Sequence, residues 1–232
     1  MQKFLRFFVL MAMFALPFAS NAQTSWTVAD STAVHATVPL DFYNCDGSGV
    51  REAQMLYPAS LLTSMNGSTL GSITFYHQNA TASKTLTAST WYILIGETTE
   101  TDLSSGFSTV ALDTVYAGNL VVTSGVFSFD FTTPYTYNGG NLIVEILTTG
   151  ATGNWFGSSN QGCYGMDSIG STYSSMSTPN YTSFLPKTTF TEAPTCFPVI
   201  NLAATSVTST GLTLTWSDDV NSSATYTIYS NG

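Results

Sequence analysis

Apolar and polar residues alternate along most of the chain with the two-residue period of half-buried β-strands. The alternation is clearest in residues 34–40, 71–76, 91–95, 126–131 and 142–146. Turn-forming pairs such as Asn66-Gly67 and Ser124-Gly125 separate these segments, and no helical period lies between them. We therefore predict an all-β fold, an antiparallel β-sandwich of the jelly-roll kind, with a closed barrel as the alternative.

The N-terminus has a different pattern from the rest of the chain. Lys3 and Arg6 precede an apolar run over residues 7–18, and the small residues of Ser20-Asn-Ala22 follow it. The run is too short for a membrane span, which needs about 20 residues. We predict a signal peptide over residues 1–22, cleaved between Ala22 and Gln23, and a secreted or cell-surface protein with no membrane insertion of the mature chain.

Two domains are expected after the signal peptide. Residues 23–192 are enough for one sandwich with its own core, and a proline-bounded linker over 193–198 follows. In residues 199–232 alternation starts again and stops at Asn231-Gly232, a pair typical of hairpin turns. Three strands cannot cover both inner faces of a sandwich, so we expect an incomplete second domain at the front of a longer protein.

Both predicted domains resemble known modules. Trp216 and Tyr226 occupy places that resemble the core Trp and Tyr of a fibronectin type III module. The order of motifs at residues 54–61, 71–76, 91–96, 115–118, 127–137, 140–144 and 185–190 resembles a β-sandwich module of secreted surface proteins of Bacteroidetes, akin to adhesin-type domains. The resemblance implies a multidomain surface or secreted protein, often exported by a type IX system.

The charge balance excludes some partners. Charged residues make up only 8% of the chain, against about 25% in typical globular proteins. Removal of the signal peptide leaves three cations, Arg51, Lys84 and Lys187, against 14 acidic residues. Nucleic acids and anionic membrane surfaces are therefore disfavoured as partners, because both are bound mainly through cationic side chains.

The chain offers no clear catalytic group, and we predict a non-enzymatic protein. His35 and His77 lie in or at the end of predicted strands, and the G-x-S-x-G pattern of a serine nucleophile is absent. Glu97 with Glu100, and Asp41 with Asp46, are the acid pairs closest in sequence that could serve glycoside hydrolysis. We interpret both pairs as solvated turn residues.

Three cysteines in an exported chain allow one disulfide. Because the fibronectin-like modules often carry a later cysteine, the resemblance implies a Cys45–Cys163 disulfide and a missing partner for Cys196. A Cys163–Cys196 disulfide is the alternative. No cofactor is expected, although Asp41, Asp46 and Asp167 could contribute oxygen ligands to a structural calcium ion.

The strongest candidate binding region is the Gly/Ser/Thr/Asn-rich stretch over residues 147–183. Aromatic rings beside amide and carboxylate groups suit sugar rings, so the candidate ligand-binding residues are Trp155, Asn160, Gln161, Tyr164 and Asp167. Alternatively, the aromatic residues only fix this long segment to the sandwich. We predict adhesion or the binding of a glycan or an extracellular protein. The alternatives are an accessory region of a secreted peptidase or glycosidase, or a stalk without ligand.

Overall fold

The computed structural model describes residues 23–36, 38–39, 50–149, 162–174, 180–194, 200–205 and 213–217. In these residues all regular structure is β-strand, apart from two short 3-10 helices, η1 (Ala59–Leu61) and η2 (Thr63–Met65). The chain divides into two compact units, Met1–Glu192 and Ala193–Gly232. No helix of the described part has the length and apolar character needed to cross a membrane.

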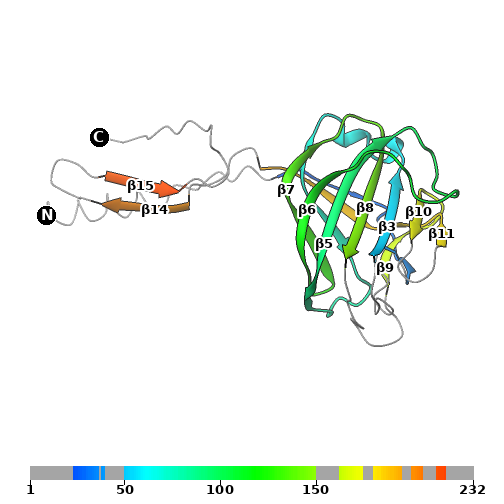
Figure 1. The fold of residues 1–232 in the computed structure, drawn as a ribbon, viewed down its shortest axis with the longest axis horizontal. Helices are drawn as coiled ribbons and strands as arrows, with labels where there is room; N and C mark the ends of the chain where they lie inside the picture. Colours follow the sequence, from blue (N-terminus) through cyan, green and yellow to red (C-terminus); the bar gives the residue numbers. More distant parts are fainter. Residues whose placement is uncertain are drawn as a thin grey trace, which may run out of the picture. The chain divides into compact units, whose positions relative to one another are not determined.

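A ten-stranded antiparallel sheet forms most of the first unit (Figure 1). In spatial order its strands are β1 (Ser25–Val28), β13 (Thr188–Glu192), β4 (Thr69–Tyr76), β7 (Val126–Thr136), β6 (Asp113–Thr123), β5 (Lys84–Thr98), β8 (Asn141–Thr149), β3 (Val50–Tyr57), β10 (Ser171–Ser174) and β11 (Asn180–Thr182). A second, three-stranded sheet contains β12 (Leu185–Pro186), β9 (Cys163–Met166) and β2 (Ala33–His35).

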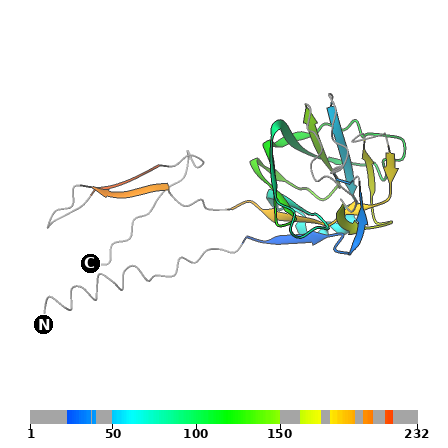
Figure 2. The same cartoon turned by 90° about the horizontal axis from the view of Figure 1, so that it is seen from below.

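The large sheet curls around the main apolar core (Figure 2). Alternate residues of each strand face this core, and the largest fully buried side chains include Trp91, Tyr57, Phe75 and Phe127. The small sheet joins the large one where His77, just after β4, forms an isolated bridge with Cys163 of β9. The inner face of the large sheet is therefore filled by packed side chains, so the accessible side chains of this sheet lie on its outer face.

Two-residue turns fix the register of the hairpins. Ser124 and Gly125 connect β6 to β7 with φ of 50° and 76°. Positive φ at both central residues is the geometry that matches the twist of antiparallel strands. A side chain at Gly125 would lie 2.6 Å from the Asn79 carbonyl oxygen, so the turn also requires glycine for space.

Hydroxyl groups cover the outer face of β1, β13, β4 and β7, which we call the hydroxyl face. Thr27 and Thr189 are joined at 2.7 Å, and Thr74 and Ser128 are joined at the same distance. The first bond ties the short edge strand β1 to β13, and the second joins β4 to β7. The hydroxyl groups are partners of one another.

The second unit contains an antiparallel pair, β14 (Ile200–Thr205) and β15 (Thr213–Ser217). The third predicted strand of this unit, over residues 224–229, lies outside the described residues. The fibronectin type III resemblance therefore stays a prediction.

The predicted fold class is confirmed: the described chain is an all-β, antiparallel, sandwich-like fold. The alternative of a closed barrel is wrong for the described strands, because β1 and β11 are the two edges of the ten-stranded sheet. The predicted strand over 34–40 is shorter than expected, since β2 ends at His35.

Candidate functional site

The predicted binding residues are described only in part. Trp155, Asn160 and Gln161 lie outside the described residues. Tyr164 lies in β9, where its hydroxyl donates to the Gln78 carbonyl oxygen at 3.2 Å. Asp167 follows β9 and is exposed. The structure thus gives Tyr164 a role in joining β9 to the segment after β4, and the five-residue site stays a prediction.

The two histidines flank Cys163. His35 of β2 is the register partner of Cys163, and the His77 Nδ1 accepts a hydrogen bond from the Asn79 backbone N–H at 3.0 Å. Burial lowers the pKa of His35, and the nearby Asp167 raises it to a smaller extent. The His35 ring also packs against Phe184, with 5.2 Å between centroids. These contacts are those of packed strand residues.

Cys163 is a buried free thiol. Burial raises the pKa of this thiol well above its ordinary value, so the reactive thiolate is disfavoured. Its two predicted partners, Cys45 and Cys196, lie outside the described residues. Neither predicted disulfide is present in the part of the chain that the structure describes.

No cluster of three His, Cys, Asp or Glu side chains within the described ranges could hold a metal ion. Asp41 and Asp46, the other proposed calcium ligands, lie outside these ranges. Asp167 alone is described, and it supplies one carboxylate.

A different group of polar and aromatic residues comes together on the outer face of the large sheet. Tyr181, Tyr173, Gln54 and Glu145 are successive register partners across β11, β10, β3 and β8. Glu52, Leu147 and Tyr92 form the adjacent line across β3, β8 and β5. We call this group the outer strip: Glu52, Gln54, Tyr92, Glu145, Leu147, Tyr173 and Tyr181.

Gln54 fixes the centre of the outer strip. Its Nε2 donates to Glu145 Oε2 at 2.7 Å and to the Ser108 carbonyl oxygen at 3.3 Å. Its Oε1 accepts from the Ser108 backbone N–H at 2.7 Å. Gln54 is 3% exposed, so these bonds satisfy a polar group that burial would otherwise destabilise. They also tie residues 99–112, between β5 and β6, to the sheet.

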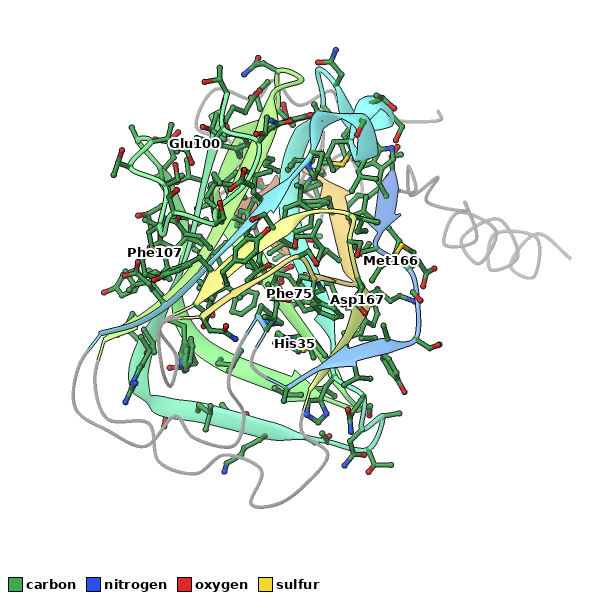
Figure 3. All side chains as sticks on the ribbon, turned by 90° about the vertical axis from the view of Figure 1, so that its right-hand side faces the viewer. His35, Phe75, Glu100, Phe107, Met166 and Asp167 are labelled. Carbon is green, nitrogen blue, oxygen red and sulfur yellow. The ribbon has the colours of Figure 1, made fainter. Side chains whose placement is uncertain are left out.

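Residues 99–112 cover one end of the strip with a small second core. Leu103 packs with Leu56 and Ile143, and the Leu103 backbone N–H donates to Ser171 Oγ at 2.7 Å. Phe107 meets Tyr173 edge-on, with 4.7 Å between ring centroids. Figure 3 shows Glu100 and Phe107 on one side of the molecule and Met166 and Asp167 on the other, with Phe75 between them.

The part of the strip that residues 99–112 leave uncovered is accessible. Glu52, Tyr92, Leu147 and Tyr173 are partly buried, and Tyr181 is 40% exposed. Glu52 and the tyrosine rings therefore present surface to solvent, while the buried Gln54 and Glu145 side chains fix the strands beneath them. Such an arrangement can stack on a ligand and donate or accept hydrogen bonds.

The Glu145 carboxylate acts on Glu52. Glu145 is 8% exposed and Glu52 lies diagonally across from it on the neighbouring strand. Burial raises the pKa of Glu52, and the Glu145 carboxylate raises it further.

The side chains of Glu97 and Glu100 each accept hydrogen bonds from other parts of the chain. Glu97 Oε1 accepts from the Asn138 backbone N–H and Glu97 Oε2 from the Gly140 backbone N–H, both at 2.7 Å. Glu100 Oε1 accepts from Ser108 Oγ at 3.0 Å. The interpretation of both as solvated turn acids is wrong, since each is half-buried and holds a connection between strands.

Sequence reasoning missed the outer strip. One signal was present: Glu145 is the single charged residue within the apolar run Leu142-Ile-Val-Glu-Ile146. A charge there requires a partner or a function. Its partner Gln54 is 91 residues away, and nothing local in the sequence pairs the two.

Comparison with known proteins finds no matching family model, no matching curated protein and no matching solved structure.

Proposed function

We propose that this chain is a non-catalytic binding module of a secreted or cell-surface protein, acting in adhesion, and that the outer strip contacts its ligand. The observation that carries the proposal is a set of accessible side chains on the outer face of five neighbouring strands: Glu52, Tyr92, Leu147, Tyr173 and Tyr181. A rigid sheet here presents rings and hydrogen-bonding groups side by side. Tyrosine-rich surfaces on rigid scaffolds are typical of protein recognition sites.

The dimensions of the strip favour an extended ligand. From β5 to β11 the strip crosses five adjacent strands. With about 4.8 Å between neighbouring strands, Tyr92 and Tyr181 lie on strands about 19 Å apart when measured along the curled sheet. An oligosaccharide or an extended peptide could run across the strands and meet both rings.

The proposed location and domain organisation rest on the sequence pattern. Export by a signal peptide ending at Ala22 and a following fibronectin-like module belong to the same proposal. N-terminal sequencing of the exported protein tests it: a mature chain that starts at Gln23 supports export, and an uncleaved Met1 in a cytosolic fraction contradicts it.

Ring substitutions test the binding role. We would screen glycan and extracellular-protein arrays with the wild type, Tyr92→Ala and Tyr181→Ala. Val121→Ala is the control, since Val121 is 43% exposed and lies on β6, outside the strip. A ring at the centre of a contact contributes about 1.4 kcal/mol or more, so each strip variant should lose at least about tenfold in affinity.

Loop variants separate this site from the one predicted by sequence. Trp155→Ala and Tyr164→Ala are measured in the same screen, together with melting temperature. Loss of binding in these variants with unchanged binding in the strip variants would move the site to residues 147–183. Absence of any bound ligand on the arrays would favour the stalk and refute the proposal.

A further inference from the structure

The two histidines of the chain both lie beside the same residue of β9. His35 of β2 is the register partner of Cys163 on one side, and His77, just after β4, forms an isolated bridge with Cys163 on the other. Residues that lie directly opposite each other on paired strands share one face of the sheet, and Cys163 is fully buried on that face. A change in histidine charge would therefore act on β9 from both sides.

The hydrogen bonding of His77 requires a neutral ring. The residue is 2% exposed, and its Nδ1 accepts the Asn79 backbone N–H at 3.0 Å. The single proton of the neutral imidazole then lies on Nε2, so a second proton would have to sit on Nδ1. That proton would break the 3.0 Å bond and leave only the 3.4 Å contact of Nδ1 with the Asn79 carbonyl oxygen. It would also place a charge among buried side chains.

His35 lies in surroundings that also favour a neutral ring. Its ring packs on Phe184, with 5.2 Å between centroids. Burial lowers the pKa of His35, and the Asp167 carboxylate raises it to a smaller extent. The nearby acid therefore opposes the effect of burial without cancelling it.

The other titratable groups around β9 do not supply a charge that would hold a protonated histidine. Burial raises the pKa of Tyr57 and of Cys163, so both stay neutral. Lys187, which follows β12, forms an ion pair with Asp30 before β2. Proton uptake at His35 and His77 is thus the charge change that β9 meets as the pH falls.

We propose that the pairing of β2 with β9 is an acid-sensitive latch, in which proton uptake by His35 and His77 frees β2 from the sheet. β2 is three residues long and lies at the edge of the small sheet, so few backbone bonds hold it. The opened strand takes up protons that the closed sheet disfavours. Since the pKa of His35 is lowered in the closed sheet, the stability of the latch is present at neutral pH and is lost as the pH falls below about 6.5.

The latch is connected to the outer strip along the chain. β9 continues through residues 167–170 into β10, which carries Tyr173. β10 also carries Ser171, whose Oγ accepts the Leu103 backbone N–H. Opening of β2 would remove one of the two strands that flank β9 in the small sheet. Weaker ligand binding in acid rests on the proposed binding function, whereas the latch itself does not.

Amide hydrogen exchange of the full chain at about pH 7.5 and about pH 5.5, corrected for the intrinsic exchange rate at each pH, tests the latch. The amides of residues 33–35 are compared with those of β8 in the large sheet. The variants are His35→Gln alone and together with His77→Gln, because glutamine does not titrate and can still accept the Asn79 N–H. Asp167→Asn is the control for titration of the carboxylate. Melting curves at neutral pH verify that each variant folds, and His35→Gln alone decides if the double variant does not.

Acidification should raise the opening constant of β2 at least about tenfold, because each histidine that stays neutral in the closed sheet contributes up to about tenfold over this pH range. β8 should show no comparable rise. His35→Gln should reduce the rise at least about twofold, the double variant should abolish it, and Asp167→Asn should keep or increase it. A rise that His35→Gln leaves unchanged, that β8 shares, or that Asp167→Asn abolishes would overturn the latch. Amides of β2 that are unprotected at neutral pH would also overturn it.

Discussion

Gln54→Met tests whether the centre of the outer strip is fixed as the structure indicates. Methionine keeps the length of the side chain and removes all of its hydrogen-bonding groups. The Ser108 backbone N–H and the Glu145 carboxylate, both buried, then lose their partners at 2.7 Å. The apolar packing around position 54 changes little.

The expected cost follows from these two groups. An unsatisfied buried N–H costs about 1–3 kcal/mol, and a lost hydrogen bond to a charged group costs about 1.5–3 kcal/mol. The two share one side chain and are not additive, so we expect a loss of about 3 kcal/mol in the free energy of unfolding. A domain with about 5–15 kcal/mol of stability would remain folded.

Urea unfolding at neutral pH measures this loss. Thr74→Val is the matched control, because it removes the exposed 2.7 Å bond to Ser128 and should change stability by about 0.5 kcal/mol or less. A Gln54→Met loss below about 1 kcal/mol, or one equal to that of the control, would refute the view that Gln54 ties residues 99–112 to the sheet.

Three further predictions concern charge and backbone. Glu52→Gln should raise the melting temperature at neutral pH and leave it unchanged near pH 3. The pKa of Glu52 is raised in the folded state, so the folded protein is more stable when Glu52 is protonated and loses that stability as the pH rises. A pH-independent effect would contradict this. Burial and the Glu97 carboxylate raise the pKa of Tyr135 to about 12, so the stability of the fold should fall from about pH 10 toward pH 12. In a pH series of unfolding curves, Tyr135→Phe should reduce the slope of that fall. An unchanged slope would contradict this prediction. Gly125→Ala should lose about 2–3 kcal/mol by urea unfolding, because φ is 76° and the new Cβ would lie 2.6 Å from a carbonyl oxygen. Gly67→Ala, with φ of 81° and no atom within 4 Å, should lose only about 1 kcal/mol, and equal losses would show that space at Gly125 is not limiting.

Local patterns in the sequence predicted the strands and turns well. The alternation over 71–76 and 126–131 falls within β4 and β7, and the Ser124-Gly125 signal is the β6–β7 turn. Both depend on neighbouring residues alone. The full length of β5 was not predictable, because irregular register interrupts its alternation between Leu86 and Trp91.

Long-range pairing could not be read from the sequence. β1 pairs with β13, joining Trp26 to Phe190, and no local signal identifies that partner. The outer strip also depends on long-range pairing, since Glu52 and Glu145 meet only when β3 lies beside β8. Composition could suggest an aromatic binding region, but not which strands would carry it.

Locating a bound ligand is the most direct test of the outer strip as the binding surface. We would assign the methyl and aromatic nuclear magnetic resonance signals of the chain and titrate it with a glycan or protein fragment that binds on the arrays. We expect shift changes at Tyr92, Leu147 and Tyr181. Changes confined to the hydroxyl face, around Thr74 and Thr189, would contradict it.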